Sequence, residues 1–255
     1  MNKVLVIFGS KSDEKVYNEI AAELKKQKVA FELRVSSAHK TPKDVDDVLE
    51  NDYSAVIAGA GLAAHLPGVA AARVIRPVIG VPCEGNYQGL DALLSIAQMP
   101  PGIPVLAVGV GKGDVAAQNC AKMMKKYKSV TLIGGKSNAV VKKAEETLKR
   151  LNALYSFAEK PNPKTVNIIF TDFDEPVEKN EELVIYCPLL MPQNDKASTS
   201  LNFLKHTGHG LWVGINNGTN AAVAAVEIMS IDNEFEEALL HYRTEMAKKV
   251  LESNE

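Results

Sequence analysis

The sequence is poor in cysteine, in aromatic residues and in excess charge. Its 255 residues contain three cysteines (Cys83, Cys120 and Cys187) and no CxxC pair, which argues against a disulfide framework and predicts small buried thiols. Aromatic residues make up only 6%, so the apolar content is mainly aliphatic, as is typical of parallel α/β cores. The formal net charge of −2 provides no global basic field to bind nucleic acid.

Long hydrophobic runs are also missing. No apolar stretch approaches the roughly 20 residues that a helix needs to span a bilayer, so we expect no membrane partner. The amino terminus leads directly into a strand pattern, without a charged leader or a cleavage site, so we expect no signal peptide. Together these absences predict a cytoplasmic protein.

Short apolar runs alternate with amphipathic patterns along the first half of the chain. The predicted strands cover 3–8, 30–35, 54–58, 77–81 and 104–110, and the predicted helices cover 14–28, 42–50, 90–97 and 114–125. Strands that are apolar throughout and separated by helices indicate a parallel sheet with right-handed crossovers. The fold class predicted from this pattern is therefore α/β.

The same pattern then starts again near residue 129. The motif Gly-Ser-Lys-Ser-Asp at 9–13 corresponds to Gly-Gly-Lys-Ser-Asn at 134–138, at an offset of 125, whereas 108–124 corresponds to 213–229 at an offset of 105. The smaller second offset means that the second copy has lost about 20 residues in its middle. We predict a tandem duplication, with copies at 1–127 and 128–255 and a final amphipathic helix over 234–251.

The first predicted loop with polar side chains covers 9–13 and opens a helix. Its backbone N–H groups and the hydroxyls of Ser10 and Ser12 favour an anion. Asp13 has the wrong charge for a phosphate but suits ribose hydroxyls. Plain capping of the helix is the alternative interpretation.

The second loop, at 36–42, follows the second predicted strand. It places Ser37, His39 and Lys40 at the carboxyl end of a strand, where ligands bind in open parallel sheets. Lys40 is a candidate for binding a phosphate, or it is simply solvated. A loop histidine is often surface decoration, so position alone does not decide the role of His39.

The third loop, at 58–68, combines small residues with a second histidine. Gly59 and Gly61 let the backbone approach a ligand closely, and His65 lies at the same predicted sheet edge as His39. Two histidines at one edge suit proton transfer on an anionic nucleotide. No cysteine or carboxylate cluster accompanies them, which disfavours a zinc site. The G-x-S-x-G elbow of serine hydrolases is also missing, which disfavours that class of enzyme.

In wording and order these motifs resemble the family of the phosphoribosylaminoimidazole carboxylase catalytic subunit, also called N5-carboxyaminoimidazole ribonucleotide mutase. The matching pieces are GSKSD (9–13), SSAHKTP (36–42), AGAGLAAHLPG (58–68), PVIGVP (77–82) and GLDALLSIAQMPPGIPV (89–105). They cover the first copy almost end to end, and 218–250 is similar to the family's closing helices. The resemblance implies a flavodoxin-like three-layer sandwich, usually an octamer with sites where subunits meet.

The resemblance also implies a purine-biosynthesis reaction and a role for each motif. A carbamate on the exocyclic nitrogen loses carbon dioxide in a closed pocket, and ring carbon 4 then captures it, without a metal or organic cofactor. His39 corresponds to the catalytic general acid/base. The substrate-binding residues that we expect are Ser10, Ser12, Asp13, Ser37, Lys40, Gly59, Gly61, Ala64, His65 and Leu66.

Two details leave the carboxyl donor open. Lys40 stands where bacterial mutases usually carry arginine, and AHK is also the wording of animal-type enzymes that use carbon dioxide directly. AHLPG at 64–68 is the wording of the mutases, so we favour the mutase and keep direct carboxylation as the alternative. A carboxylase of another heteroaromatic nucleotide and a non-enzymatic nucleotide-binding module remain further alternatives.

The second copy lacks the candidate residues of the first. Asn138 replaces Asp13, the segment 158–163 has no histidine where SSAHKTP stood, and the AHLPG segment is missing. His206 and His209 lie in the later loop that matches QMPPG. We therefore predict an inactive, structural second copy and a homotetramer that imitates the octamer with four active sites.

Overall fold

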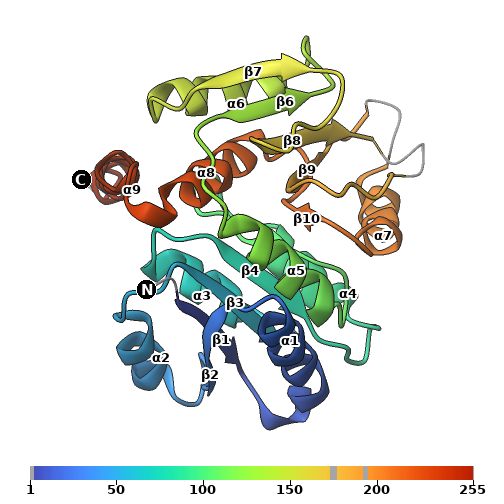
Figure 1. The fold of residues 1–255 in the computed structure, drawn as a ribbon, viewed down its shortest axis with the longest axis vertical. Helices are drawn as coiled ribbons and strands as arrows, with labels where there is room; N and C mark the ends of the chain where they lie inside the picture. The colour runs from blue at the N-terminus through green and yellow to red at the C-terminus, as the bar shows by residue number, and fades with distance from the viewer. Residues whose placement is uncertain (1–2, 173–176, 192–194, 255) are drawn as a thin grey trace.

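One mostly parallel sheet runs through the whole molecule, with helices on both faces (Figure 1). The computed structural model describes residues 3–172, 177–191 and 195–254. The strand order is β2-β1-β3-β4-β5-β10-β9-β8-β6-β7. The strands are β1 (Lys3–Phe8), β2 (Ala30–Val35), β3 (Ala55–Ala60), β4 (Val78–Pro82), β5 (Leu106–Ala107), β6 (Val130–Ile133), β7 (Tyr155–Ala158), β8 (Val166–Thr171), β9 (Val184–Pro188) and β10 (Leu211–Trp212). The helices are α1 (Glu14–Lys26), α2 (Pro42–Leu49), α3 (His65–Arg73), α4 (Leu90–Ala97), α5 (Gly113–Met123), α6 (Ala139–Arg150), α7 (Lys196–His206), α8 (Gly218–Met229) and α9 (Glu236–Glu252).

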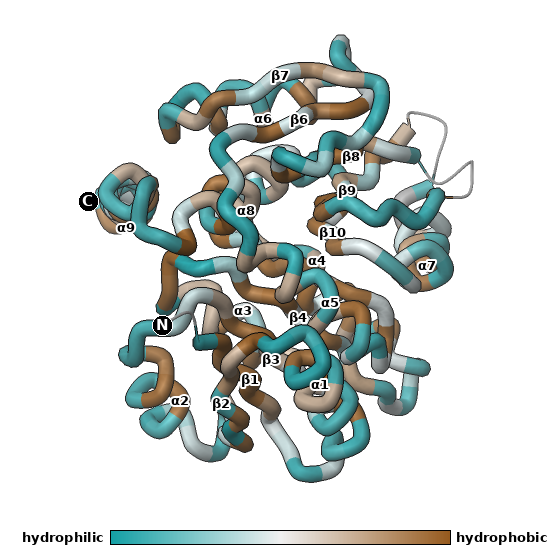
Figure 2. Tube along the Cα trace, in the orientation of Figure 1, coloured by the Kyte–Doolittle hydropathy of each residue, from teal (hydrophilic) through white to brown (hydrophobic). Residues whose placement is uncertain are grey.

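The first half is a complete three-layer unit. Its strand order, β2-β1-β3-β4-β5, is the flavodoxin-like order, so the predicted α/β class and its layers are confirmed. Alternation along β1 sends Val4, Val6 and Phe8 toward α1 and α5, whereas Leu5 and Ile7 face α2, α3 and α4. Figure 2 shows the result, with hydrophobic strands inside and hydrophilic segments on the outer helices and loops.

The second half repeats this strand order as β7-β6-β8-β9-β10 but has fewer helices. α6 and α8 cover one face, in the places that α1 and α5 occupy in the first half. On the other face α7 corresponds to α4, whereas the described residues between β7 and β9 form no helix. Among the described residues, the second half therefore lacks counterparts of α2 and α3. The change of offset from 125 to 105 places the loss of about 20 residues in the same part of the second copy.

The halves meet through one antiparallel strand pair. Trp212 of β10 pairs with Ala107 of β5, and these two residues are equivalent at the offset of 105. A contact in which a residue meets its own equivalent is the signature of a twofold interface. One buried apolar cluster extends across both halves on the α1, α5, α8 and α6 side, so the halves share a core.

One expected strand is shorter in the structure. The strand predicted over 104–110 is reduced to Leu106–Ala107, because it pairs with β4 only there and the chain turns at Gly111, whose φ is +68°. Within each half every strand pair is parallel, as predicted, and the antiparallel pair of β5 and β10 joins the two halves, for which the sequence made no prediction. The three cysteines are buried free thiols, as predicted, and burial raises the pKa of each thiol to about 12.

α9 ties the end of the chain back to the first half. Its Arg243 donates to the carbonyl oxygen of Ala71 on α3 at 2.7 Å and to the carboxylate of Glu227 on α8 at 3.0 Å. Glu227 is only 1% exposed, and burial raises the pKa of its carboxyl to about 8, against the opposing effect of Arg243. The same arginine therefore joins three helices from both halves.

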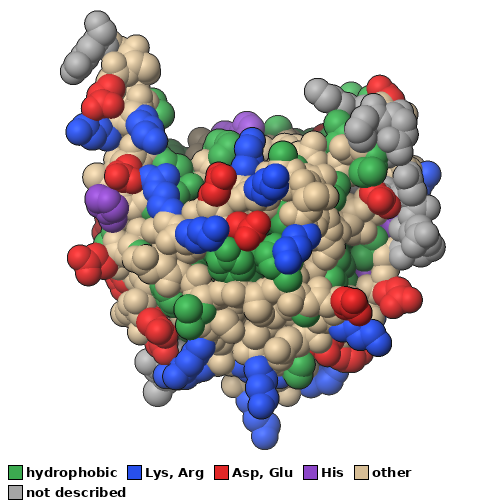
Figure 3. All heavy atoms as spheres, turned by 90° about the horizontal axis from the view of Figure 1, so that it is seen from above, with side chains coloured by type: hydrophobic (Ala, Val, Ile, Leu, Met, Phe, Trp, Pro, Cys, Tyr) green, Lys and Arg blue, Asp and Glu red, His purple; other side chains and the backbone are tan. Residues whose placement is uncertain are grey.

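Charged side chains of both signs are interspersed on the face of the second half shown in Figure 3, where the end of α9 projects from the body. The predicted apolar stripe on α9 is only partly buried. Leu239 and Tyr242 are buried, but Val250 is 67% exposed. Among the described residues, no helix combines the length and apolar character that crossing a membrane requires.

α6 and α8 approach each other backbone to backbone at Gly218. A Cβ added there would lie 2.2 Å from the carbonyl oxygen of Val140, so Gly218→Ala should lower the free energy of unfolding by about 1–3 kcal/mol. Urea denaturation measures this change. Gly208→Ala is the matched control, because its Cβ would meet nothing within 4 Å, and we expect a change within about 0.5 kcal/mol. Equal, small effects of the two substitutions would contradict the close packing.

Candidate functional site

A cavity of about 450 Å³ opens at the carboxyl ends of β1, β2 and β3. This volume falls in the range of small-molecule sites. Because parallel strands end at the same sheet edge, the three loops that follow them meet there. α1, α2 and α3 all begin beside the cavity, so the positive ends of three helix dipoles favour a negatively charged ligand.

The loop after β1 presents two hydroxyls and a carboxylate to the cavity. Ser12 donates from its hydroxyl to Ser10 Oγ at 2.8 Å and from its backbone N–H at 3.2 Å, which fixes the turn that enters α1. Partial burial raises the pKa of Asp13, against hydrogen bonds from Ser12 and Cys83 that lower it. The turn thus offers hydroxyls to a phosphate and a carboxyl to hydroxyl groups.

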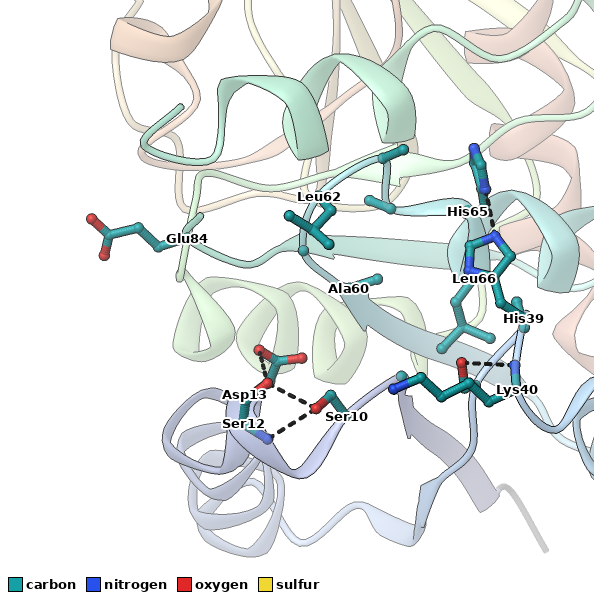
Figure 4. Close-up of a pocket in the computed structure, with 16 residues that line it drawn as sticks. Ser10, Ser12, Asp13, His39, Lys40, Ala60, Leu62, His65, Leu66 and Glu84 are labelled. Atoms are coloured by element: carbon teal, nitrogen blue, oxygen red, sulfur yellow. Dashed lines mark hydrogen bonds between the residues drawn. The ribbon is translucent and has the colours of Figure 1, made fainter. Parts of the chain in front are cut away.

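The loop after β2 is held by its own hydroxyl network. Ser37 accepts from the backbone N–H of Lys40 at 3.3 Å, and its own N–H donates to Thr41 Oγ1 at 2.9 Å. Figure 4 shows the Lys40 side chain extended across the cavity toward Ser10. The one cationic side chain among the lining residues therefore approaches the hydroxyl-bearing turn, which makes this end suited to a phosphate.

The loop after β3 holds a tight conformation in front of α3. Leu62 and Ala64 adopt φ angles of +55° and +30°, and the N–H of Ala64 bonds to the carbonyl of Gly61 at 3.0 Å. Left-handed backbone at non-glycine residues costs about 1–3 kcal/mol each and is concentrated at functional sites. This turn delivers His65 and Leu66 to the cavity at the start of α3.

The two histidines from different loops face one another. His39 Nε2 lies 2.8 Å from His65 Nδ1, and the ring centroids are 4.9 Å apart at an interplanar angle of 76°. One nitrogen must donate and the other accept, so the bond requires that the two rings are not both protonated. Both side chains are exposed to the cavity opening, where a substrate can reach them. The contact therefore gives a path by which a proton can pass from one ring to the other.

The structure gathers the predicted residues at this cavity with one exception. Gly59 lies buried within β3, and a Cβ there would be 2.0 Å from the ring of Phe8, so its lack of a side chain serves packing. Ten of the predicted residues line the cavity, namely Ser10, Ser12, Asp13, Ser37, His39, Lys40, Gly61, Ala64, His65 and Leu66. Sequence reasoning missed Glu84, whose signal was its position two residues after the end of β4.

The corresponding loops of the second half carry no such set. Asn138 caps α6 by accepting from the N–H of Val140 at 2.8 Å, and the segment after β7 has no histidine. His206 is the last residue of α7 and His209 lies in the loop between α7 and β10, so neither belongs to the loops that follow β6 and β7. Within the described part of the chain, no three His, Cys, Asp or Glu side chains are grouped as metal ligands.

The comparisons with known proteins fall mainly on the first half. The family model described as AIR carboxylase matches residues 3–132. The N5-carboxyaminoimidazole ribonucleotide mutase of Methanocaldococcus jannaschii is 51% identical over 115 residues, which cover 45% of this chain and 73% of the relative. The enzyme of the same name from Pseudomonas aeruginosa is 37% identical over 166 residues, covering 62% and 95%.

Among solved structures, Treponema denticola PurE matches with 27% identity and a TM-score of 0.43, covering 49% of this chain and 83% of that one. The family model spans half of the chain, and its span contains each of the three loops that line the cavity. The chain therefore belongs to the AIR carboxylase family.

Proposed function

We propose that this chain is an N5-carboxyaminoimidazole ribonucleotide mutase of purine biosynthesis, with the active site in its first half. The observation that carries the proposal is the His39–His65 pair, 2.8 Å apart, at one side of a cavity whose other side bears Ser10, Ser12 and Lys40. One side is suited to a phosphate and the other to proton transfer. The names of the relatives supply the substrate class.

The proposed reaction needs one proton to move in each direction. His39 protonates the exocyclic nitrogen as its bond to the carboxyl carbon breaks, which releases carbon dioxide inside the cavity. Ring carbon 4 then attacks the carbon dioxide, and His39 takes the proton that this carbon loses as the ring regains aromaticity. The net change is a carboxyl group moved from nitrogen to carbon, with no external reactant.

Substrate orientation follows from the lining residues. Lys40 and the hydroxyls of Ser10 and Ser12 would bind the phosphate, and Asp13 the ribose hydroxyls. The ring then lies between the histidine pair and the turn at 61–64. Holding carbon dioxide beside carbon 4 in this closed turn supplies the proximity that recapture needs.

Product formation from two separate inputs tests the proposal. One input is aminoimidazole ribonucleotide with bicarbonate and carbon dioxide, and the other is its N5-carboxy derivative at low carbon dioxide. We expect fast turnover of the carbamate. Efficient use of free carbon dioxide, with the carbamate no faster than its spontaneous breakdown, would instead establish direct carboxylation. Activity with neither would reject both reactions and favour another heteroaromatic nucleotide or a binding role.

We also propose that the second half, 128–255, is an inactive duplicate and that four chains form a homotetramer. The repeated strand order and the pairing of Ala107 with its equivalent Trp212 support a fused dimer. Leu62 and Tyr87, which are 65% and 71% exposed, offer further apolar contact surface to another chain. Native mass measurement should give four chains, whereas a fully active monomer at micromolar concentration would reject the assembly. A cytoplasmic location stays a prediction.

A further inference from the structure

We infer that Asn220, in the second half, is a positioning residue for the active site in the first half. The inference rests on the proposed function and deepens it. Asn220 is 1% exposed and lies in the first turn of α8. Its side-chain amide contacts the main chain of the loop between α4 and β5, which belongs to the QMPPG motif at 98–102.

The amide bonds this loop at several points. Asn220 Oδ1 accepts from the N–H of Gly102 at 2.6 Å, and its Nδ2 donates to the carbonyl of Pro100 at 3.0 Å and, more weakly, to that of Met99 at 3.4 Å. Asn217 adds a bond to the carbonyl of Met99 at 3.0 Å. Since all of these bonds involve main-chain atoms, they set the position of the loop itself.

The loop in turn contacts the helix that carries the second histidine. The Met99 thioether sulfur would lie 3.3 Å from a Cβ at Gly68, so it packs directly against α3. α3 begins at His65, whose Nδ1 bonds His39. A shift of the loop would therefore move α3 and change the geometry of the histidine pair and of the carbon dioxide pocket.

The twofold relation between the halves shows that this contact is one-sided. The residue equivalent to Asn220 in the first half, at the offset of 105, is Val115, which has no amide. The seam is closely packed on both sides, because a Cβ at Gly109 would meet the carbonyl of Thr207 at 2.6 Å and one at Gly214 that of Ala97 at 2.7 Å. Close packing of the seam therefore does not require an amide side chain, since Val115 serves on one side. The amide of Asn220 is present on the side where the contacted loop supports His65.

Asn220→Ala should lower kcat about 10- to 100-fold while KM changes less than threefold, because displacement of reacting groups by about 1 Å is that costly and the phosphate side of the cavity is untouched. More aminoimidazole ribonucleotide should be released per turnover, since carbon dioxide escapes before recapture. Met99→Ala breaks the same path without touching Asn220, and the double variant should lose no more than either single one.

Asn167→Ala is the matched control. Asn167 is a fully buried amide of the second half that donates to the carbonyls of Asn162, Thr165 and Leu183, all within that half. It should lose stability but keep kcat and the product ratio. A folded Asn220→Ala protein with wild-type kcat, or one changed no more than Asn167→Ala, would overturn the inference.

Hydrogen exchange separates this inference from the proposed function. Amides of α3 should exchange faster in Asn220→Ala than in the wild type or Asn167→Ala, whichever substrate the enzyme uses. If the wild type turns over neither input, the proposed function fails while faster exchange still supports the positioning of α3. Unchanged exchange in α3 of Asn220→Ala would reject the inference. If Asn220→Ala does not fold, the same measurement on Met99→Ala decides, and unchanged exchange there would also reject it.

Discussion

Replacing His39 by asparagine should lower kcat with the carbamate substrate about 10²- to 10⁴-fold, the range that positioned acid–base groups contribute. Asparagine keeps a hydrogen-bonding side chain of similar reach, but it cannot take up and return a proton. Nucleotide binding should persist, because Ser10, Ser12 and Lys40 remain in place. Steady-state kinetics gives kcat, and equilibrium binding of the product gives the retained affinity.

The control for this substitution is His241→Asn. His241 is an exposed histidine on α9 that lies 3.4 Å from Glu245, outside the cavity lining. It should retain wild-type kcat within about twofold, since surface substitutions away from special features have small effects. A His39→Asn enzyme that keeps more than a tenth of wild-type kcat would show that another group transfers the proton.

Arg243→Met should lower the free energy of unfolding by about 2–4 kcal/mol at pH 8.5, because it leaves the buried carboxyl group of Glu227 without its hydrogen-bond partner. The bond to the carbonyl of Ala71 is lost as well. Urea denaturation at pH 5.5, 7 and 8.5 measures the loss. Arg73→Met, which removes an exposed pair with Asp46, should change stability far less.

The loss should grow with pH, and its sign follows from Glu227. Burial raises the pKa of this carboxyl to about 8 in the folded protein, above its ordinary value of 4.5, so the folded state holds a proton that the unfolded chain releases. Wild-type stability from this group is therefore full below about pH 4.5 and is lost as the pH rises to about 8. Removing Arg243 raises that pKa further. Arg243→Met combined with Glu227→Gln should abolish the added pH dependence; a loss independent of pH would contradict this account.

Much of the site was predictable, because it follows from strand order. Ser10, His39 and His65 are far apart in the chain, but each follows the end of a parallel strand within five residues, and such strands end at one sheet edge. Apolar runs and loop motifs therefore predicted which side chains meet. The bond between the histidine rings was not predictable, because it depends on the left-handed turn at Leu62 and Ala64, which the residue types there disfavour.

Features that depend on the contact between halves were missed for a different reason. The repeat predicted two similar units, but no pattern in either unit says that β5 and β10 pair antiparallel. Asn220 looked like an ordinary residue near a helix start, since its loop partner lies more than a hundred positions earlier in the chain. Gly59 was predicted to bind the ligand because it lies in a glycine-rich motif. In the structure, the ring of Phe8 leaves no room for a side chain at this position.

The two strands of the antiparallel seam are synthesised far apart in time, because β5 and β10 lie about a hundred residues apart in the chain. The first half emerges from the ribosome with its three cavity loops complete, but Asn220 and Arg243 follow only after the last strand, β10. At a translation rate of about 5–20 residues per second, Asn220 is synthesised on the order of ten seconds after the loop at 99–102 that it contacts. Over that interval the edge of β5 is unpaired, so nascent chains are open to pairing with one another until β10 arrives. A ribosomal pause between the halves should therefore reduce the yield of folded enzyme more than a pause after α9.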